Sequence, residues 1–184
     1  MKQIIYVLVF LFMVFQLSPF YAAAADDARM MKAKGIADEI TGLRSTLAAS
    51  LAESGKTVSP EVFENVCGSV KKRAMTIAKK EGVKIRHAAI KNRNPDHGAT
   101  ADEVKFHDFF TSNSKTEGLW NLVEIEGSRY DRYVKPIYIE AACLACHGDK
   151  EKRPSFIKKK YPEDKAFNFK EGDLRGIIEV MIPQ

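Results

Sequence analysis

The sequence contains few cysteines and no long apolar run. Its 184 residues include three cysteines, and the single Cys/His cluster has no second Cys/His pair at zinc-finger spacing. No uninterrupted stretch reaches the roughly 20 apolar residues that a membrane-spanning helix needs. Internal repeats, low-complexity tracts and a linker that would divide the chain are also absent. With 45% hydrophobic and 29% charged residues, the chain has the length and composition of one globular domain that buries a core.

The N-terminus has the pattern of a secretory signal peptide. Lys2 precedes an apolar run from Ile4 to Phe15, and small residues end the segment at Ala22 to Ala25. We therefore expect residues 1–25 to be cleaved on export, so that residues 26–184 form a single periplasmic domain without stable membrane insertion. An uncleaved N-terminal anchor is the alternative.

The charge balance is modestly basic. The formal net charge is +5, and loss of Lys2 with the signal peptide lowers it by one to +4. An exported protein meets no chromosome, so nucleic acid is not an expected partner. The basic clusters are interpreted as a solvated face, with an acidic partner protein or an anionic membrane surface as alternatives.

Periodic apolar residues predict two N-terminal helices. They recur at helical intervals from Ala28 to about Ser54, beginning with Met31. Ser59 and Pro60 then have the capping and first-turn chemistry that begins a second helix. In that helix Cys67 falls on the apolar stripe, so we expect it to face the core.

The second half of the chain predicts an antiparallel sheet. Residues 119–125 and 132–140 are rich in β-branched and aromatic side chains and resemble a hairpin, while 174–183 read as a last strand. A short helix is expected over 102–110. The block 143–173 is predicted to be an irregular excursion, which compact domains rarely keep unless it binds something. The expected fold class is α+β, with N-terminal helices followed by an antiparallel sheet.

The segment Cys143-Leu144-Ala145-Cys146-His147 has the spacing of covalent c-type haem attachment. The two thiols, one turn apart, can add to the two vinyl groups of one porphyrin, and His147 then lies under the iron as proximal ligand. The predicted export supports one haem c per chain, because c-type haem is attached outside the cytoplasm. A disulfide, a thioredoxin-like redox pair and a zinc site use the same residues and remain alternatives.

The iron's sixth position is open to a second ligand, to a gas or to neither. Cys67 is the odd cysteine, and its simplest interpretation is a small buried hydrophobe. A nearby ferric iron would deprotonate it and make it a strong thiolate ligand. His87, His97, His107 and several methionines remain candidates, although each histidine has an ordinary structural or solvated explanation.

Several segments taken together are more specific than the attachment motif. They are Val66-Cys67, Arg86 with "KNRNP" at 91–95, "YVKPIYIE" leading into "CLACHGD", and the closing "GDLRGIIEV". Through them, nearly all of the mature chain resembles a family of exported c-type haem proteins with a PAS-like fold. The family occurs in cyanobacteria and other bacteria, and its domain is also the sensory part of some receptors.

The resemblance implies a ligand set. In that family the iron is bound by the histidine of the attachment motif and by a cysteine thiolate from the N-terminal helices, which correspond to His147 and Cys67. The sequence departs from the family at His97, where the family tends to have asparagine, and this keeps His97 as a rival sixth ligand. Arg86 and Arg93 are candidates to pair with the haem propionates, with ordinary surface charge as the equal alternative.

The expected function is a redox or diatomic-gas sensing module, and not an enzyme. A thiolate stabilises ferric iron and gives a low reduction potential. On reduction Cys67 could leave, admit CO or NO and move its helix, and an unknown redox or signalling protein would receive the message. A soluble electron-transfer cytochrome is the alternative.

Overall fold

The computed structural model describes residues 18–55 and 57–184. Most of the predicted signal peptide, residues 1–17, lies outside this part, so its cleavage stays a prediction. Within the described part, no helix is both long and apolar enough to cross a membrane.

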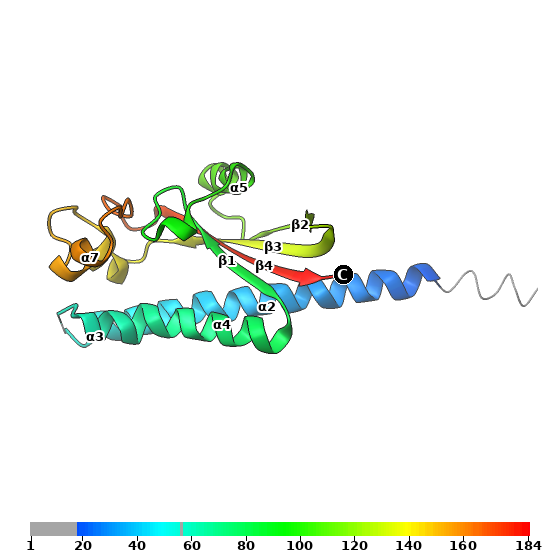
Figure 1. Cartoon of the computed structure of the whole chain (residues 1–184), viewed down its shortest axis with the longest axis horizontal. Helices are drawn as coiled ribbons and strands as arrows, with labels where there is room; N and C mark the ends of the chain where they lie inside the picture. Colours follow the sequence, from blue (N-terminus) through cyan, green and yellow to red (C-terminus); the bar gives the residue numbers. More distant parts are fainter. Residues whose placement is uncertain (1–17, 56) are drawn as a thin grey trace, which may run out of the picture.

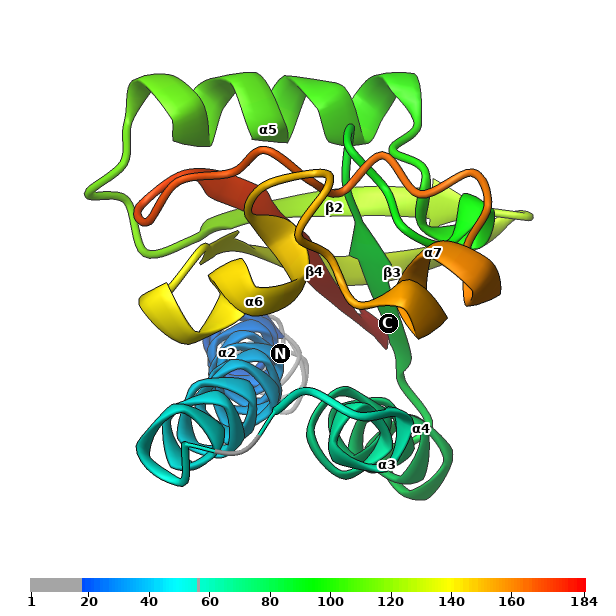
Figure 2. The same cartoon turned by 90° about the vertical axis from the view of Figure 1, so that its left-hand side faces the viewer.

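The N-terminal half is helical. Its elements are α2 (Ser18–Glu53), α3 (Pro60–Phe63), a π-helical turn (Glu64–Gly68) and α4 (Ser69–Glu81). The Ser59 side chain accepts a hydrogen bond from the Val62 amide and caps α3, as the sequence predicts. Gly82 ends α4 with a φ of 64°, a left-handed conformation that favours glycine. Figures 1 and 2 show α2 and α4 side by side.

The C-terminal half contains one antiparallel sheet in the order β1-β4-β3-β2. Its strands are β1 (Lys84–Ala88), β2 (Leu119–Ile125), β3 (Ser128–Tyr138) and β4 (Leu174–Pro183). Glu126 and Gly127 join β2 to β3 and both have positive φ, as the favoured two-residue hairpin turn requires. The predicted hairpin and α+β class are confirmed, although β3 begins four residues before the expected position.

Helices cover both faces of the sheet. Helices α2 and α4 pack against one face, and α5 (Ala101–Ser112) packs against the other (Figures 1 and 2). The first interface buries a cluster of small and branched side chains from α2, α4 and the sheet, among them Ile36, Ile40, Val70, Ile77, Ile178 and Val180. The second is smaller and centres on Phe110, Val134 and Ile177.

Two sequence expectations about the helices and loops are wrong. Met31 is expected on the buried stripe of the first helix but is 75% exposed, because that stripe runs through Ala33, Ile36, Ala37 and Ile40, and a residue two positions before Ala33 lies on the opposite side of the helix. The excursion over 143–173 also contains two short helices, α6 (Leu144–His147) and α7 (Ser155–Lys160). Such one-turn helices are too short to produce a periodic pattern, so tertiary contacts decide them.

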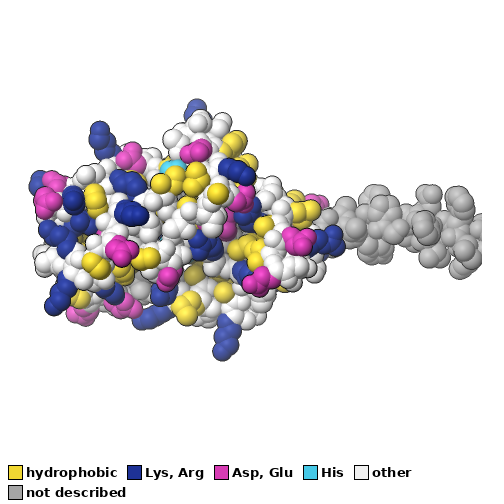
Figure 3. All heavy atoms as spheres, turned by 45° about the horizontal axis from the view of Figure 1, so that its top comes forward, with side chains coloured by type: hydrophobic (Ala, Val, Ile, Leu, Met, Phe, Trp, Pro, Cys, Tyr) yellow, Lys and Arg dark blue, Asp and Glu magenta, His cyan; other side chains and the backbone are white. Residues whose placement is uncertain are grey.

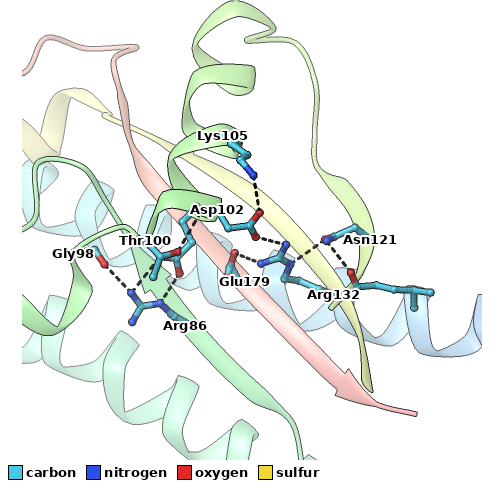
Figure 4. A network of polar contacts seen from close by, with 10 residues as sticks. Arg86, Gly98, Thr100, Asp102, Lys105, Asn121, Arg132 and Glu179 are labelled. Carbon is cyan, nitrogen blue, oxygen red and sulfur yellow. Dashed lines mark hydrogen bonds and ion pairs between the residues drawn. The ribbon is translucent and has the colours of Figure 1, made fainter. Parts of the chain in front are cut away.

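A polar network joins α5 to the sheet (Figure 4). The Arg132 guanidinium lies between Asp102 of α5 and Glu179 of β4, with nitrogen–oxygen distances of 2.7 and 3.3 Å. Arg86 pairs with Glu103, whose carboxylate also completes the capping box at the start of α5. On the face shown in Figure 3, basic side chains are interspersed with acidic ones.

Glu179 gives the folded state a specific pH dependence. Burial raises its pKa to about 7, and the nearby Arg132 guanidinium opposes this shift. Because the folded pKa exceeds the unfolded one, protonation of Glu179 favours folding, and this stability is lost as the pH rises through about 7. We expect Glu179→Gln to gain roughly 2–3 kcal/mol over wild type between pH 4.5 and pH 8 in urea unfolding curves.

The matched control is Glu124→Gln, at an exposed position of β2. It should keep the wild-type dependence of unfolding free energy on pH. Parallel curves for wild type and Glu179→Gln would show that Glu179 is ionised across this range in the folded state, contrary to the prediction.

Candidate functional site

A cavity of about 960 Å³ lies between the α3–α4 segment and the sheet. This volume is near the upper end of the ~300–1,000 Å³ range of ligand pockets. Its walls come from the α3–α4 segment, β1, the 93–97 loop and the start of β4, and Figure 2 looks along α2 and α4 at this end of the molecule. Four of the six predicted site residues, separated widely in sequence, line it together: Cys67, Arg86, Arg93 and His147. The two cysteines of the predicted attachment motif, Cys143 and Cys146, are not part of its lining.

The attachment motif lies where the chain leaves β3. A 3₁₀ turn (Ala141–Cys143) continues into α6, so the two cysteines, three positions apart, lie on neighbouring turns of helical backbone. Cys143 and Leu144 pack against a small apolar cluster formed by Ile139, Ala166 and Phe169. Both motif cysteines are half-buried free thiols, so the alternative disulfide is not formed in this structure. Burial raises the pKa of Cys146, and the Arg93 guanidinium opposes this.

The contacts of the His147 imidazole favour one tautomer. Its Nδ1 lies 2.8 Å from the Ala166 carbonyl oxygen, which can only accept, and 3.4 Å from Arg93 Nη2, which can only donate. Because the carbonyl contact is much the shorter, we assign the proton to Nδ1, and Nε2 keeps its lone pair. Burial, followed by the charges of Arg175 and Arg93, holds the pKa of His147 well below its ordinary value. A neutral ring with a free Nε2 and a carbonyl behind Nδ1 is the arrangement of a metal-ligating histidine.

Asp164 fixes the loop that supplies this carbonyl. Its carboxylate accepts hydrogen bonds from Arg93 at 3.2 Å, from Arg153 at 2.7 Å and from the Ala166 amide at 2.8 Å. The side chain is 2% exposed, so these partners compensate a buried charge. The Phe169 amide also donates to the His147 carbonyl at 3.0 Å, which ties the loop to the motif.

Cys67 does not lie in the packed core, contrary to the sequence expectation. It belongs to the π-helical turn between α3 and α4, where the extra residue rotates it out of the stripe that Val70, Ala74 and Ile77 continue into the core. Its thiol is exposed and lines the cavity. The surrounding walls still desolvate it, so burial raises the pKa of Cys67, while Arg44 and Arg93 oppose the shift. Single π-helical turns occur frequently at functional sites.

Of the other candidate iron ligands, some line the cavity and one lies outside it. His87, His97 and Met75 line the cavity, with the two imidazole centroids 6.3 Å apart. Burial, with the charge of Arg44 as the next cause, lowers the pKa of His87 to about 3, so the ring is neutral. His107 lies on α5 and is not part of the cavity wall. His97 therefore remains a spatially possible rival to Cys67.

Both arginines that were predicted to meet propionates already have carboxylate partners. Arg86 pairs with Glu103 and also donates to the carbonyl oxygens of Asp96 and Gly98, at 3.0 and 2.7 Å. Arg93 pairs with Asp164 and donates to the Cys146 carbonyl at 2.6 Å. Their guanidinium groups therefore fix the walls of the cavity.

Among the cavity residues that the sequence analysis did not single out are two arginines, Arg44 of α2 and Arg175 of β4. Arg44 follows Ile40 by four positions and so lies on the buried stripe of α2, which is the signal that could have identified it. Positive charge dominates the cavity wall, because seven lysines and arginines line it against the two carboxylates of Glu64 and Asp96. This balance suits an anionic ligand.

The residues of this cavity fit the predicted haem. Two buried polar atoms on its wall, Arg44 Nε and His87 Nε2, have no hydrogen-bond partner within the described chain. An imidazole and a thiol from separate elements reach the same space, and the wall also contains apolar side chains such as Val70, Ile137 and Ile177. Over residues 18–55 and 57–184, no cluster of three or more His, Cys, Asp or Glu side chains could hold a metal ion by itself.

Comparison with known proteins agrees with this arrangement. The model of the Tll0287-like family matches residues 22–183. The crystal structure of the cyanobacterial heme-protein Tll0287 resembles the chain with a TM-score of 0.70 and 38% sequence identity, over 82% of this chain and 91% of that one. None of the curated proteins matches the chain. Because the family match spans nearly the whole sequence, the chain belongs to the Tll0287-like family.

Proposed function

We propose that the chain is an exported haem protein, and not an enzyme, in which Cys143 and Cys146 hold one haem covalently while His147 and Cys67 bind its iron. The observation that carries the proposal is the convergence of a neutral His147, with Nε2 free, and the Cys67 thiol on one cationic cavity. The relative of known structure is itself a heme-protein, which supports the same cofactor here. Export to the periplasm follows from the signal-peptide pattern.

The haem would supply an iron that changes oxidation state and accepts axial ligands. His147 would be the permanent ligand, because its ring is fixed from behind by the Ala166 carbonyl. Cys67 would be the exchangeable one. As a thiolate it would favour ferric iron, whereas as a protonated thiol it would be a weaker ligand that leaves room for CO or NO.

The position of Cys67 supports a sensing role. The π-helical turn that carries it runs directly into α4, and α4 connects through Gly82 to β1 at the edge of the sheet. Movement of Cys67 would therefore be transmitted through α4 to the sheet edge, where a redox or signalling protein could respond.

The proposal is tested by haem attachment. We expect the full chain, expressed in cells that attach c-type haem, to keep its haem after denaturation and organic extraction, measured by haem staining of a denaturing gel. The double variant Cys143→Ser/Cys146→Ser should lose this covalent haem completely, because both thioether bonds are removed. Cys67→Ser is the matched cysteine control and should keep covalent haem. An unlabelled wild-type band would contradict the proposed cofactor.

Electron transfer is the second candidate function, and the lysines in the cavity wall favour it. Lys71, Lys72 and Lys160 line the cavity and could guide an acidic redox partner to the haem edge. The two functions predict different reactions of the reduced protein with CO. A sensor should bind CO on reduction, whereas an electron carrier should keep both axial ligands and exclude CO, as optical spectra of the reduced protein under CO would reveal.

A further inference from the structure

Two half-buried arginines on the cavity wall form no ion pair with a carboxylate. Arg44 reaches the cavity from α2 and Arg175 from the start of β4. Among the described residues, no ion pair includes either guanidinium. Arg44 Nε is buried without a hydrogen-bond partner, and Arg175 donates to one group, the Lys91 carbonyl at 3.0 Å. An uncompensated buried charge is costly, so these groups point to a missing anion.

The nearby acidic side chains are already engaged. Asp164 accepts from Arg93 and Arg153, and Glu140 accepts from the Ser45 hydroxyl. Within the described residues, no carboxylate forms an ion pair with Arg44 or Arg175, although the charges of Glu140 and Asp164 act on them without such contact.

The arginines also act on each other. Burial lowers the pKa of Arg175 to about 10, and the charge of Arg44 is the next cause. Burial likewise lowers the pKa of Arg44. Two guanidinium groups that repel each other in a desolvated wall are stabilised best by a ligand with two negative charges.

The two arginines that the sequence suggested as propionate partners are not available to bind such a ligand. Arg86 and Arg93 are satisfied by Glu103 and Asp164, together with backbone carbonyls. Planar guanidinium groups bind carboxylates in a bidentate manner, and haem has two carboxylates in its propionates.

We propose that Arg44 and Arg175 bind the two haem propionates. This assignment rests on the proposed haem-binding function, and it identifies the side chains that hold the group opposite the vinyl edge of the porphyrin. The thioether bonds of Cys143 and Cys146 and the two ion pairs would together define the orientation of the haem in the cavity.

The test follows the ionisation of the propionates in haem-loaded protein. Haem labelled with carbon-13 at the propionate carboxylates is attached in cells, and isotope-difference infrared spectra are recorded against pH. In wild type we expect both propionates to stay ionised to unusually low pH. Arg44→Gln and Arg175→Gln should each raise the apparent pKa of a propionate by about one unit or more, a tenfold change in proton affinity.

Two kinds of control keep the result interpretable. Arg73→Gln removes a half-exposed arginine of α4 that pairs with Glu39 outside the cavity wall, and it should leave the propionate titration unchanged. Arg44→Lys and Arg175→Lys keep the positive charge and should restore most of the wild-type titration. The assignment would be overturned if the wild-type propionates titrated as solvent-exposed carboxylates, or if neither Gln variant changed their apparent pKa. Either result would leave the proposed haem binding intact. A wild type without covalent haem would instead refute the proposed function.

Discussion

Cys67→Ser is expected to remove the thiolate from the iron while leaving the haem attached. The hydroxyl of serine is a poor iron ligand, whereas a thiolate donates strongly to ferric iron. Electron paramagnetic resonance and optical spectra of the oxidised variant should therefore lose the low-spin thiolate signature of wild type. Its reduction midpoint should rise by on the order of 100 mV, because the ferric state is no longer favoured by the thiolate.

Met75→Leu is the matched control for Cys67→Ser, since Met75 offers the other non-motif sulfur on the cavity wall. It should keep the wild-type spectra. Identical spectra for wild type and Cys67→Ser would remove Cys67 from the ligand set. His97→Ala would then be the next variant, because His97 lines the same cavity.

Asp164→Asn is expected to destabilise the folded chain by about 3–5 kcal/mol. The substitution keeps the shape of the side chain but removes its charge, which leaves the buried Arg93 and Arg153 without their shared carboxylate. It also weakens the acceptor for the Ala166 amide, and Ala166 is the residue whose carbonyl orients His147. Urea unfolding of the haem-loaded protein measures the loss of stability.

The control for Asp164→Asn is Glu39→Gln. Glu39 pairs with Arg73 across α2 and α4, but both side chains are nearly half exposed, so the pair should contribute less than about 1 kcal/mol. Equal losses for the two variants would mean that the Asp164 cluster behaves as an ordinary surface contact, and the argument that it fixes the His147 loop would fail.

The layout of the fold could be predicted because it depends on local patterns. The two N-terminal helices follow from apolar periodicity and from the Ser59 cap, and the hairpin follows from the residues on either side of Glu126 and Gly127. The short helices α6 and α7 could not be predicted in this way. Their four and six residues are too few for a periodic signal, and they depend on packing in the 143–173 segment.

The candidate site was predictable where chemistry depends on spacing along the chain. The motif from Cys143 to His147 is contiguous, and Cys67 was identified as the remaining cysteine. Its surroundings were predicted incorrectly, because a helical wheel assumes a constant 3.6-residue period. The π-helical turn at Glu64–Gly68 breaks that period and rotates Cys67 from the core stripe into the cavity.

Sequence alone determined the class of the fold, the predicted attachment motif and the family resemblance, since all three depend on local patterns or on residue identity. Only the tertiary structure decided which charges are satisfied. The sequence singled out Arg86 and Arg93 for the propionates, but folding pairs these two with Glu103 and Asp164. Arg44 and Arg175 form no ion pair with any described residue, and Arg44 Nε has no hydrogen-bond partner there. Pairing of a buried charge depends on groups far apart along the chain, and this is why the free arginines emerged only from the assembled cavity.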